Sequence, residues 1–327
     1  QPSAEKFRAM LSTPWGRKRA LSSIDLQADA GPIRRGSLHK LMRRKSTLAF
    51  LMTLPLLTLM IALVAYPAGF AIYLSLLNRT MTRFVGLDNF AYLMSRERFW
   101  MVVFQTCLFA VAAVALKAFL GFVAAHLVHN LPTKGQRKWR GMLLVPWVIP
   151  PAMSTLAWLW LFDPSYSAFN YIFALFGIGP VPWTGDAYWA RFSVILVNIW
   201  YGSPFFMIMY LAGLKSVSAE LYESATMDGA NAFQRLIYVT IPMMRNIIAI
   251  TVLFSTIVTF ANFDIVRVLT YGGPRNTTDL FSTWAFKLGI GSGDIPLAAA
   301  VSLFLFPLLA ILAIFILRDV SRRAREI

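Results

Sequence analysis

Charged and amide side chains lie within two long apolar stretches of the sequence. Lys117 lies in one stretch, and Asn262, Asp264 and Arg267 lie close together in another. Polar groups at membrane depth usually face an internal cavity, where they can hydrogen-bond a polar ligand. Asp264 and Arg267 are three residues apart, so a structural ion pair on one helix face is the alternative. The sequence contains no His–Asp, Ser–Lys or double-Asp arrangement typical of a catalytic pair, so we expect a non-catalytic protein.

The composition is both basic and apolar. Of the 327 residues, 57% are hydrophobic and 14% are charged, the net charge is +16 and the mean hydropathy is +0.60. A soluble domain is typically about 45–50% apolar and about 25% charged. These values favour a protein that crosses a membrane several times, and they argue against a soluble enzyme or a nucleic-acid-binding protein.

Metal and nucleotide chemistry have little support in the sequence. The single cysteine, Cys107, excludes an internal disulfide, and three scattered histidines do not make a common zinc pattern. The sequence also has no G-x-x-x-x-G-K-[ST] loop, which cradles phosphates in many ATPases. We therefore expect no metal and no nucleotide or other cofactor in this chain.

Six apolar stretches are long enough to cross a bilayer, which takes about 20 helical residues for roughly 30 Å of hydrocarbon. The predicted fold is therefore an all-α, polytopic membrane protein. Its core helices are expected to kink at prolines, namely Pro146, Pro150, Pro151, Pro204 and Pro307. The predicted spans are about 48–77, 99–129, 141–162, 191–214, 246–269 and 294–317.

The distribution of lysine and arginine predicts the orientation. If residues 1–46 are cytoplasmic, the segments on that side hold 22 of these cations and the loops on the other side hold 6. Cytoplasmic loops carry the excess of cations in membrane proteins, so both termini are expected in the cytoplasm. We interpret 1–46 as a basic, mostly disordered tail, 47–317 as the membrane domain, and 318–327 as a second basic tail.

The segment 163–190, on the outer side, is expected to contain a short amphipathic helix at about Ala168–Phe176. Trp183, Tyr188 and Trp189 follow it and are expected at headgroup depth, where aromatic residues gather. No pattern in this segment indicates catalysis.

The cytoplasmic segment 215–245 has a more specific pattern. Ser218 is a good N-cap for a helix that continues to about Met227, and Gly229 then supplies a turn conformation that a Cβ would resist. A second amphipathic segment, Ala232–Val239, is expected to end before Pro242. From composition alone, two helices lying on lipid headgroups would be the simplest interpretation.

The order of residues in this segment resembles the cytoplasmic coupling loop of ABC importer permeases. That loop has a Glu-Ala-Ala string, a later Gly and an Ile-x-Leu-Pro string, which Glu223-Ser224-Ala225, Gly229 and Val239-Thr240-Ile241-Pro242 match in order and spacing. The departures, Ser for Ala, Val for Ile and Ile for Leu, are small changes in size. Three other strings resemble the family in the same order, namely Phe84–Phe90, Arg140–Trp147 and Leu269–Pro274. The resemblance covers about 48–317 and is strongest to the maltose/glycerol-phosphate type of permease.

The resemblance implies a type I ABC importer permease fold and a location in the inner membrane of a prokaryote. The chain would form half of the pathway for a sugar, polyol or glycerol phosphate. The implied partners are a homologous second permease, two ATPase subunits that bind ATP and Mg, and an extracytoplasmic substrate-binding protein. The residues implied to dock on an ATPase subunit are Glu223, Ala225, Asp228, Gly229, Ala230 and Pro242. Glu223 is the candidate for an ion pair there, with plain solvated surface as its alternative.

The implied substrate pathway contains the polar residues of the fifth span. Asn262 or Asp264 is a candidate to hydrogen-bond the hydroxyls of a sugar, and Phe260 or Phe263 could stack on its ring. The sequence does not identify which cargo is carried or whether this chain or the second permease binds it.

Two further residues have competing interpretations. Lys117 could meet an anionic substrate such as a glycerol phosphate, but pairing within the helix bundle is favoured. Tyr271 is also a candidate for the substrate pathway. It begins an outer turn with Gly272-Gly273-Pro274 that is expected to lie near the binding protein, and this turn either contacts the cargo or only shapes the loop.

Two other protein classes have weaker support. A secondary carrier that works alone would have no use for a docking segment on its cytoplasmic face. An enzyme within the membrane would need a catalytic pair at matched depth, and the sequence does not suggest one.

Overall fold

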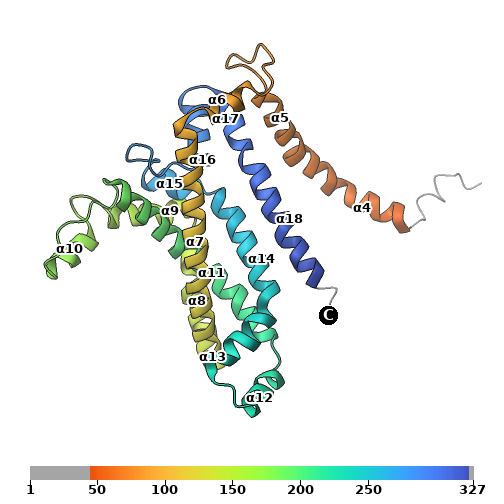
Figure 1. The fold of residues 1–327 in the computed structure, drawn as a ribbon, viewed down its shortest axis with the longest axis vertical. Helices are drawn as coiled ribbons and strands as arrows, with labels where there is room; N and C mark the ends of the chain where they lie inside the picture. Colours follow the sequence, from red (N-terminus) through yellow and green to blue (C-terminus); the bar gives the residue numbers. More distant parts are fainter. Residues whose placement is uncertain (1–44, 324–327) are drawn as a thin grey trace, which may run out of the picture. The chain divides into compact units, whose positions relative to one another are not determined.

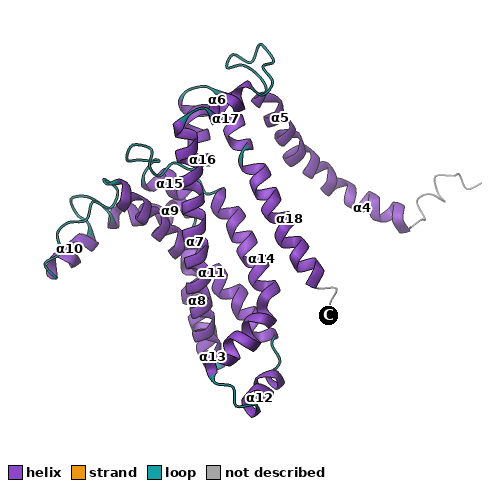
Figure 2. Ribbon diagram, in the orientation of Figure 1, coloured by secondary structure: helices purple, strands orange, loops and turns teal. Residues whose placement is uncertain are grey.

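The computed structural model describes residues 45–323, and within that range it is helical, with no strand beyond a single bridge between Leu77 and Phe84 (Figure 2). The predicted all-α fold is therefore confirmed. Residues 1–44 and 324–327 lie outside the described residues, and so does nearly all of the tail predicted at 1–46. The predicted second tail, 318–327, is not wholly irregular, because helix α18 continues to Arg323.

The chain divides into two compact units, which are described separately. The first ends at Pro67, and its described part holds helix α4 (Lys45–Met60) and the π-helical turn Ile61–Ala65. The apolar side chains of this first unit are exposed; the side chain of Leu63, for example, is 71% exposed. Lipid or another protein must cover such a helix, because apolar surface of this extent is unfavourable in water.

The second unit begins at Ala68, inside helix α5 (Tyr66–Ser75), and contains the remaining helices (Figure 1). These are α6 (Asp88–Met94), α7 (Glu97–His129), α8 (Thr133–Val148), α9 (Pro151–Leu161), α10 (Ala168–Leu175), α11 (Ala187–Ser216), α12 (Ala219–Met227), α13 (Ala232–Arg235), α14 (Ile241–Phe260), α15 (Asp264–Leu269), α16 (Phe281–Phe286), α17 (Ile295–Leu303) and α18 (Leu305–Arg323). Two π-helical turns, η2 (Leu236–Thr240) and η3 (Lys287–Gly291), lie among them.

The described residues contain five helical segments long and apolar enough to cross a membrane. They are Ala49–Ser75, Glu97–His129, Ala187–Ser216, Ala232–Phe260 and Ile295–Arg318. A sixth span is formed if α8 and α9, which meet at an angle of 89°, count as one. The predicted third span, 141–162, is thus two helices rather than one kinked helix. Pro150 and Pro151 explain the break, because a residue before proline avoids helical geometry and Ile149 has an extended backbone with ψ 135°.

The fifth span differs from its predicted bounds at both ends. We expected the helix that starts at Ala232 to end before Pro242, but α13, η2 and α14 run on without a break to Phe260. The turn before Pro242 is π-helical, and Ile241 donates its N–H to Leu236 O, five residues back. This wider turn accommodates the proline, which lacks an N–H and crowds the preceding turn of a regular helix. At the other end the helix stops at Phe260 rather than near residue 269.

Helices α7 and α11 pack side by side, and glycine permits their close approach. A Cβ on Gly121 would overlap Phe206 Cβ and lie 3.0 Å from the backbone nitrogen of Met207. Ala125, one turn further along α7, is completely buried. Small residues allow membrane helices to approach closely enough for van der Waals packing to hold them. The buried side chains of Phe206, Met207 and Tyr210 complete this contact.

The short helix predicted at Ala168–Phe176 is confirmed as α10. Ser167 caps it by accepting the N–H of Asn170. Trp183 is buried against Phe162 and donates its indole N–H to Asn170 Oδ1 at 3.0 Å. Trp183 thus belongs to an aromatic cluster with Phe162, Phe169 and Phe173.

A buried carboxylate ties together one end of the second unit. Asp279 is completely buried, with Lys287 Nζ at 2.8 Å and Arg98 Nη2 at 3.1 Å. A buried charge is tolerated when it is paired in this way, and the contacts join the start of α7 to the segment before α16. Helices α6 and α17 lie at this end, whereas α12 and α13 lie at the opposite end (Figure 1).

The close α7–α11 contact predicts that Gly121→Ala destabilises the protein by about 1–3 kcal/mol, the usual range for overpacking. The added Cβ meets a backbone atom, which cannot rotate away. Thermal unfolding of the purified protein in detergent measures the effect. Gly141→Ala is the matched control, because nothing lies within 4 Å of a Cβ at this α8 position, and alanine favours helix. Equal loss of stability in both variants would contradict the close-approach argument.

Candidate functional site

Helix α12 carries most of the residues predicted to dock on a partner. It starts after Ser218 as expected, although the Ser218 side chain forms no capping hydrogen bond. Its end is closed by two backbone bonds, from Gly229 N to Thr226 O at 3.0 Å and from Ala230 N to Ala225 O at 2.9 Å. This is the Schellman arrangement, which requires a left-handed residue after the helix. Gly229 has that conformation, with φ +79°, as the sequence predicted.

Two side-chain hydrogen bonds join α12 to the next helix. The Tyr222 hydroxyl lies 3.0 Å from Thr240 Oγ1, and Arg235 Nη1 donates to Thr226 Oγ1 at 2.9 Å. Asn231 starts α13 with a reciprocal capping box to Gln234. No residue of α12 is buried, so the helix is held by polar contacts more than by an apolar core.

The outer face of α12 is free within the described chain. Glu223 and Asp228 are exposed and make no side-chain hydrogen bond or ion pair with another described residue, and Met227 is 88% exposed. Ala225 and Ala230 are half-buried. The structure thus brings five of the six predicted docking residues together around the end of α12.

Pro242, the sixth predicted docking residue, lies elsewhere. It is exposed on the first turn of α14, beyond the π-helical turn. It follows Thr240 by two residues, and Thr240 Oγ1 lies 3.0 Å from the Tyr222 hydroxyl of α12.

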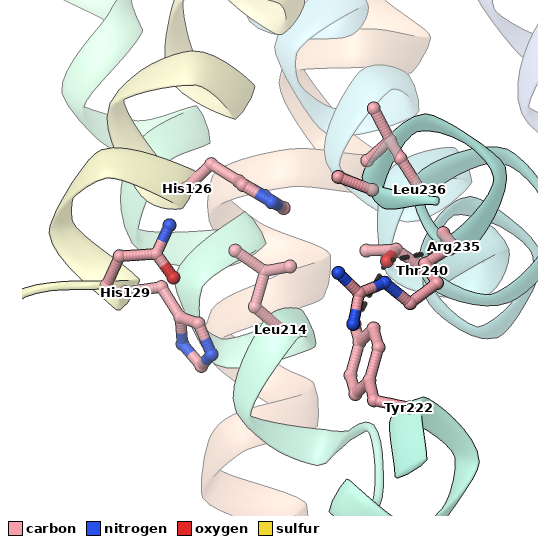
Figure 3. Close-up of a pocket in the computed structure, with 9 residues that line it drawn as sticks. His126, His129, Leu214, Tyr222, Arg235, Leu236 and Thr240 are labelled. Carbon is pink, nitrogen blue, oxygen red and sulfur yellow. Dashed lines mark hydrogen bonds between the residues drawn. The ribbon is translucent and has the colours of Figure 1, made fainter. Parts of the chain in front are cut away.

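A polar cavity of about 340 Å³ lies behind α12 (Figure 3). The ends of α7 and α11 form one side of it, and α12, α13 and η2 form the other. His126 from α7 and Arg235 from α13 point toward this space, and the Nδ1 atoms of His126 and His129 are buried without a hydrogen-bond partner. This cavity is not predictable from the sequence, because its α7 residues precede the other lining residues by more than eighty positions and share no motif with them.

The polar residues predicted for a substrate pathway lie at a break between helices. Helix α14 ends at Phe260 and α15 begins at Asp264, so Asn262 lies on irregular backbone within the predicted fifth span. The Asn262 backbone oxygen accepts a hydrogen bond from Ser282 Oγ, whereas its side-chain Oδ1 is buried without a partner. Non-helical backbone at membrane depth is tolerated where protein or a water-filled cavity surrounds it.

The two phenylalanines of this segment differ in their surroundings. Phe260 is 6% exposed and belongs to the packed interior. Phe263 is half-buried, and its ring centroid lies 5.2 Å from that of Phe286. Phe263 is therefore the more accessible of the two predicted stacking residues.

The Asp264–Arg267 ion pair considered from the sequence does not form. Asp264 is exposed at the first turn of α15, and the Arg267 guanidinium carbon lies 3.4 Å from the ring centroid of Tyr271 and 4.7 Å from that of Phe286. The guanidinium of Arg267 therefore makes cation–π contacts with two aromatic rings. Tyr271 remains 53% exposed at the adjoining turn.

Lys117 is buried inside the bundle. It is 3% exposed, and its Nζ donates to Thr259 Oγ1 on α14 at 2.8 Å. Its side chain also covers Gly202 of α11, where a Cβ would collide with it. This geometry agrees with the predicted alternative of pairing within the bundle.

Comparison with known proteins identifies the family. Residues 117–326 match the family described as "Binding-protein-dependent transport system inner membrane component". The chain is 34% identical to the trehalose/maltose transport system permease protein MalF of Thermococcus litoralis, over 88% of this chain and 98% of that protein. It is 33% identical to the galactooligosaccharides transport system permease protein GanP of Bacillus subtilis, over 77% of this chain and 65% of that protein.

A solved structure supports the fold. One chain of a bacterial alginate ABC transporter, crystallised with an alginate pentasaccharide-bound periplasmic protein, superposes with a TM-score of 0.76 at 22% identity. The match covers 88% of this chain and 98% of that chain. Taken together, the apolar spans, the family match and the relatives show that this multi-pass chain belongs to the inner membrane components of binding-protein-dependent transport systems.

Proposed function

We propose that the chain is the permease subunit of an ATP-driven ABC importer and forms half of the pathway for a sugar. Its family membership and the exposed helix α12 carry this proposal. The two relatives described above are named as transporters of trehalose and maltose and of galactooligosaccharides, and this supports a carbohydrate cargo. A glycerol phosphate fits less well, because the buried cation Lys117 is already engaged by Thr259.

Helix α12 is suited to receive motion from an ATPase subunit. It has nine residues, its end is fixed by Gly229, and it follows α11 after only Val217 and Ser218. A displacement of α12 would therefore reach α11 over a short connection. Glu223 is the proposed ion-pair partner of a basic residue on the ATPase, because it is exposed and the described chain gives it no partner.

The other residues of this segment have supporting roles in the proposal. Asp228 adds a second negative charge at the end of α12. Ala225 and Ala230 have short side chains that allow a partner to approach closely, and no atom lies within 4 Å of a Cβ position on Gly229. Pro242 is exposed at the start of α14, and its proposed role is to shape the segment that follows the docking helix.

The break between α14 and α15 is the proposed point of contact with substrate. Discontinuous helices often form substrate sites in transporters, since their irregular backbone and side chains can bind ligand. The buried Oδ1 of Asn262 has no partner in the described chain, and we propose that it accepts a hydrogen bond from a sugar hydroxyl when the break opens to substrate. Asp264 offers an exposed carboxylate beside it, and Phe263 an accessible ring.

The complete importer would contain a homologous second permease, two ATPase subunits and a substrate-binding protein. The ATPase subunits would bind ATP and Mg, and this chain would need no cofactor and would catalyse no reaction. Both termini and α12 would face the cytoplasm, as the excess of cations in those segments indicates. The outer segments Gly86–Phe90 and Tyr271–Thr278 would meet the binding protein.

The proposal predicts that a delivered carbohydrate stimulates ATP hydrolysis by the assembled complex. Proteoliposomes containing this chain, the second permease and the ATPase subunits are supplied with the binding protein and a panel of sugars, polyols and glycerol phosphates. At least one sugar is expected to raise the hydrolysis rate and to accumulate inside. Stimulation by glycerol phosphate alone would overturn the carbohydrate assignment, and accumulation without ATP would overturn the importer mechanism.

Charge reversal at Glu223 is expected to uncouple the complex. Loss of a buried interfacial charge pair costs about 2–5 kcal/mol, so Glu223→Lys should lower uptake at least tenfold while the chain still inserts and assembles. Glu220→Lys makes the same charge change one turn earlier on α12 and should have a smaller effect. Membrane quantities of both variants serve as the insertion control. Uptake that survives Glu223→Lys would contradict the docking role.

Removal of the Asn262 amide is expected to weaken uptake without lowering basal ATP hydrolysis. A lost hydrogen bond of about 0.5–1.5 kcal/mol corresponds to roughly a two- to twelvefold fall in uptake at low substrate concentration. Asn262→Ala keeps the backbone oxygen that Ser282 binds, so the local fold should persist. Asn246→Ala, on helix α14, is the control. Equal losses of uptake and basal hydrolysis would indicate a folding defect and contradict the pathway role.

A further inference from the structure

A groove of about 520 Å³ lies between helices α8 and α11. Its volume falls within the range of about 300–1,000 Å³ that is typical of small-molecule sites. Three cations and a set of apolar residues line it, namely Arg137, Arg140, Lys215, Leu144, Ile208, Leu211 and Ala212.

The lining residues are ordered along the groove. On α8, Arg137, Arg140 and Leu144 are spaced to share one helix face, with the apolar residue deepest in the span. On α11, Ile208 and Leu211 precede Lys215 by seven and four residues on a shared face. A rise of 1.5 Å per residue places the cations of each helix roughly 6–10 Å from its apolar residues. The groove is therefore cationic at the α12 end and apolar toward the middle of the membrane.

The cations of the groove have no acidic partner. Helices α8 and α11 contain no Asp or Glu at all. Arg137 and Lys215 are exposed and make no side-chain hydrogen bond or ion pair with another described residue. Arg140 donates its Nε only to the Gln136 backbone oxygen at 3.2 Å, which leaves the end of its guanidinium group available.

We propose that this groove binds an anionic phospholipid of the leaflet on the α12 side. The two guanidinium groups and the Lys215 ammonium would hold the phosphate, since arginine matches phosphate oxygens with paired N–H donors. An acyl chain would lie along Leu144, Ile208 and Leu211. Basic pockets between membrane helices on the cytoplasmic side are known to bind lipid headgroups.

The order of charges and apolar residues selects lipid over other occupants. A free phosphate would use the cations but leave the apolar wall uncovered. A helix of the second permease could cover the wall but would have to bring a carboxylate to the cationic end. One phospholipid supplies both the negative charge and the apolar chain in the required order. The proposal does not depend on docking by α12 and can fail or hold independently of it.

Lipid retention by the assembled complex tests the charge requirement. The complex is extracted from membranes that contain phosphatidylglycerol and phosphatidylethanolamine, and bound lipid is measured by native mass spectrometry. Wild type is expected to retain phosphatidylglycerol, and Arg137→Gln with Arg140→Gln should lower its occupancy about tenfold or more, because each cation near an anionic surface contributes about 1 kcal/mol.

A matched control separates the groove from general surface charge. Lys134→Gln with Lys138→Gln removes two cations of the same helix that do not line the groove, and it should leave occupancy nearly unchanged. Equal loss in both double variants would overturn the proposal. A wild-type complex that retains no phosphatidylglycerol would also overturn it, and would leave the second permease as the occupant.

A third variant tests the apolar wall. Ala212→Trp keeps every cation but fills the apolar part of the groove. Because Ala212 is exposed, we expect the larger side chain to leave the fold intact. It is expected to reduce lipid retention as strongly as loss of the two arginines. Unchanged retention, or displacement of the lipid by millimolar inorganic phosphate alone, would show that the cations bind phosphate without a seated acyl chain and would overturn the proposal.

Discussion

The close contact between α7 and α11 is the constraint on which the rest of the second unit depends. Gly121 has no room for a Cβ beside Phe206, and Lys117 fills the space over Gly202 on the same helix pair. Two long helices in such contact cannot slide past each other without displacing backbone atoms, so they behave as one rigid pair. Helices α8 and α14 pack against this pair, and α12 continues directly from the end of α11. A force applied to α12 would therefore reach the whole pair.

The two ends of the second unit are stabilised in different ways. At the end with α6 and α17, the buried carboxylate of Asp279 binds two cations from distant segments, and removal of one partner from such a buried group is costly. At the end with α12, no residue of α12 is buried and two side-chain hydrogen bonds join it to the following helical segment, while the adjoining ends of α11 and α14 keep an apolar core. Segments with little buried apolar contact open at low free-energy cost. Motion at the α12 end is thus less costly than motion at the other.

The sequence predicts elements that local rules determine. Apolar length predicts five of the spans, and the Gly229 position predicts the left-handed residue that ends α12. Proline is harder to interpret: Pro150 and Pro151 break a helix, whereas a π-helical turn lets Pro242 continue one, and nothing in the local sequence distinguishes these outcomes. The partners of individual side chains are still harder to predict. Arg267, for example, contacts the rings of Tyr271 and Phe286 and forms no ion pair with the nearby Asp264. Arg98 and Asp279 are 181 residues apart, so only the assembled fold brings them together.

Two surfaces at the α12 end carry opposite charge, namely α12 itself and the groove between α8 and α11. The segments 130–140 and 215–245, which we predict to be cytoplasmic, contain three acidic residues, Glu220, Glu223 and Asp228, and all three lie on or beside α12. The groove between α8 and α11 is lined by cations and has no acidic lining residue. An anionic membrane surface attracts the groove and repels the acidic face of α12, because both effects follow from the same surface potential. In the proposed arrangement, the sign of each surface therefore favours contact of the groove with lipid and leaves Glu223 of α12 accessible to the basic partner that we propose.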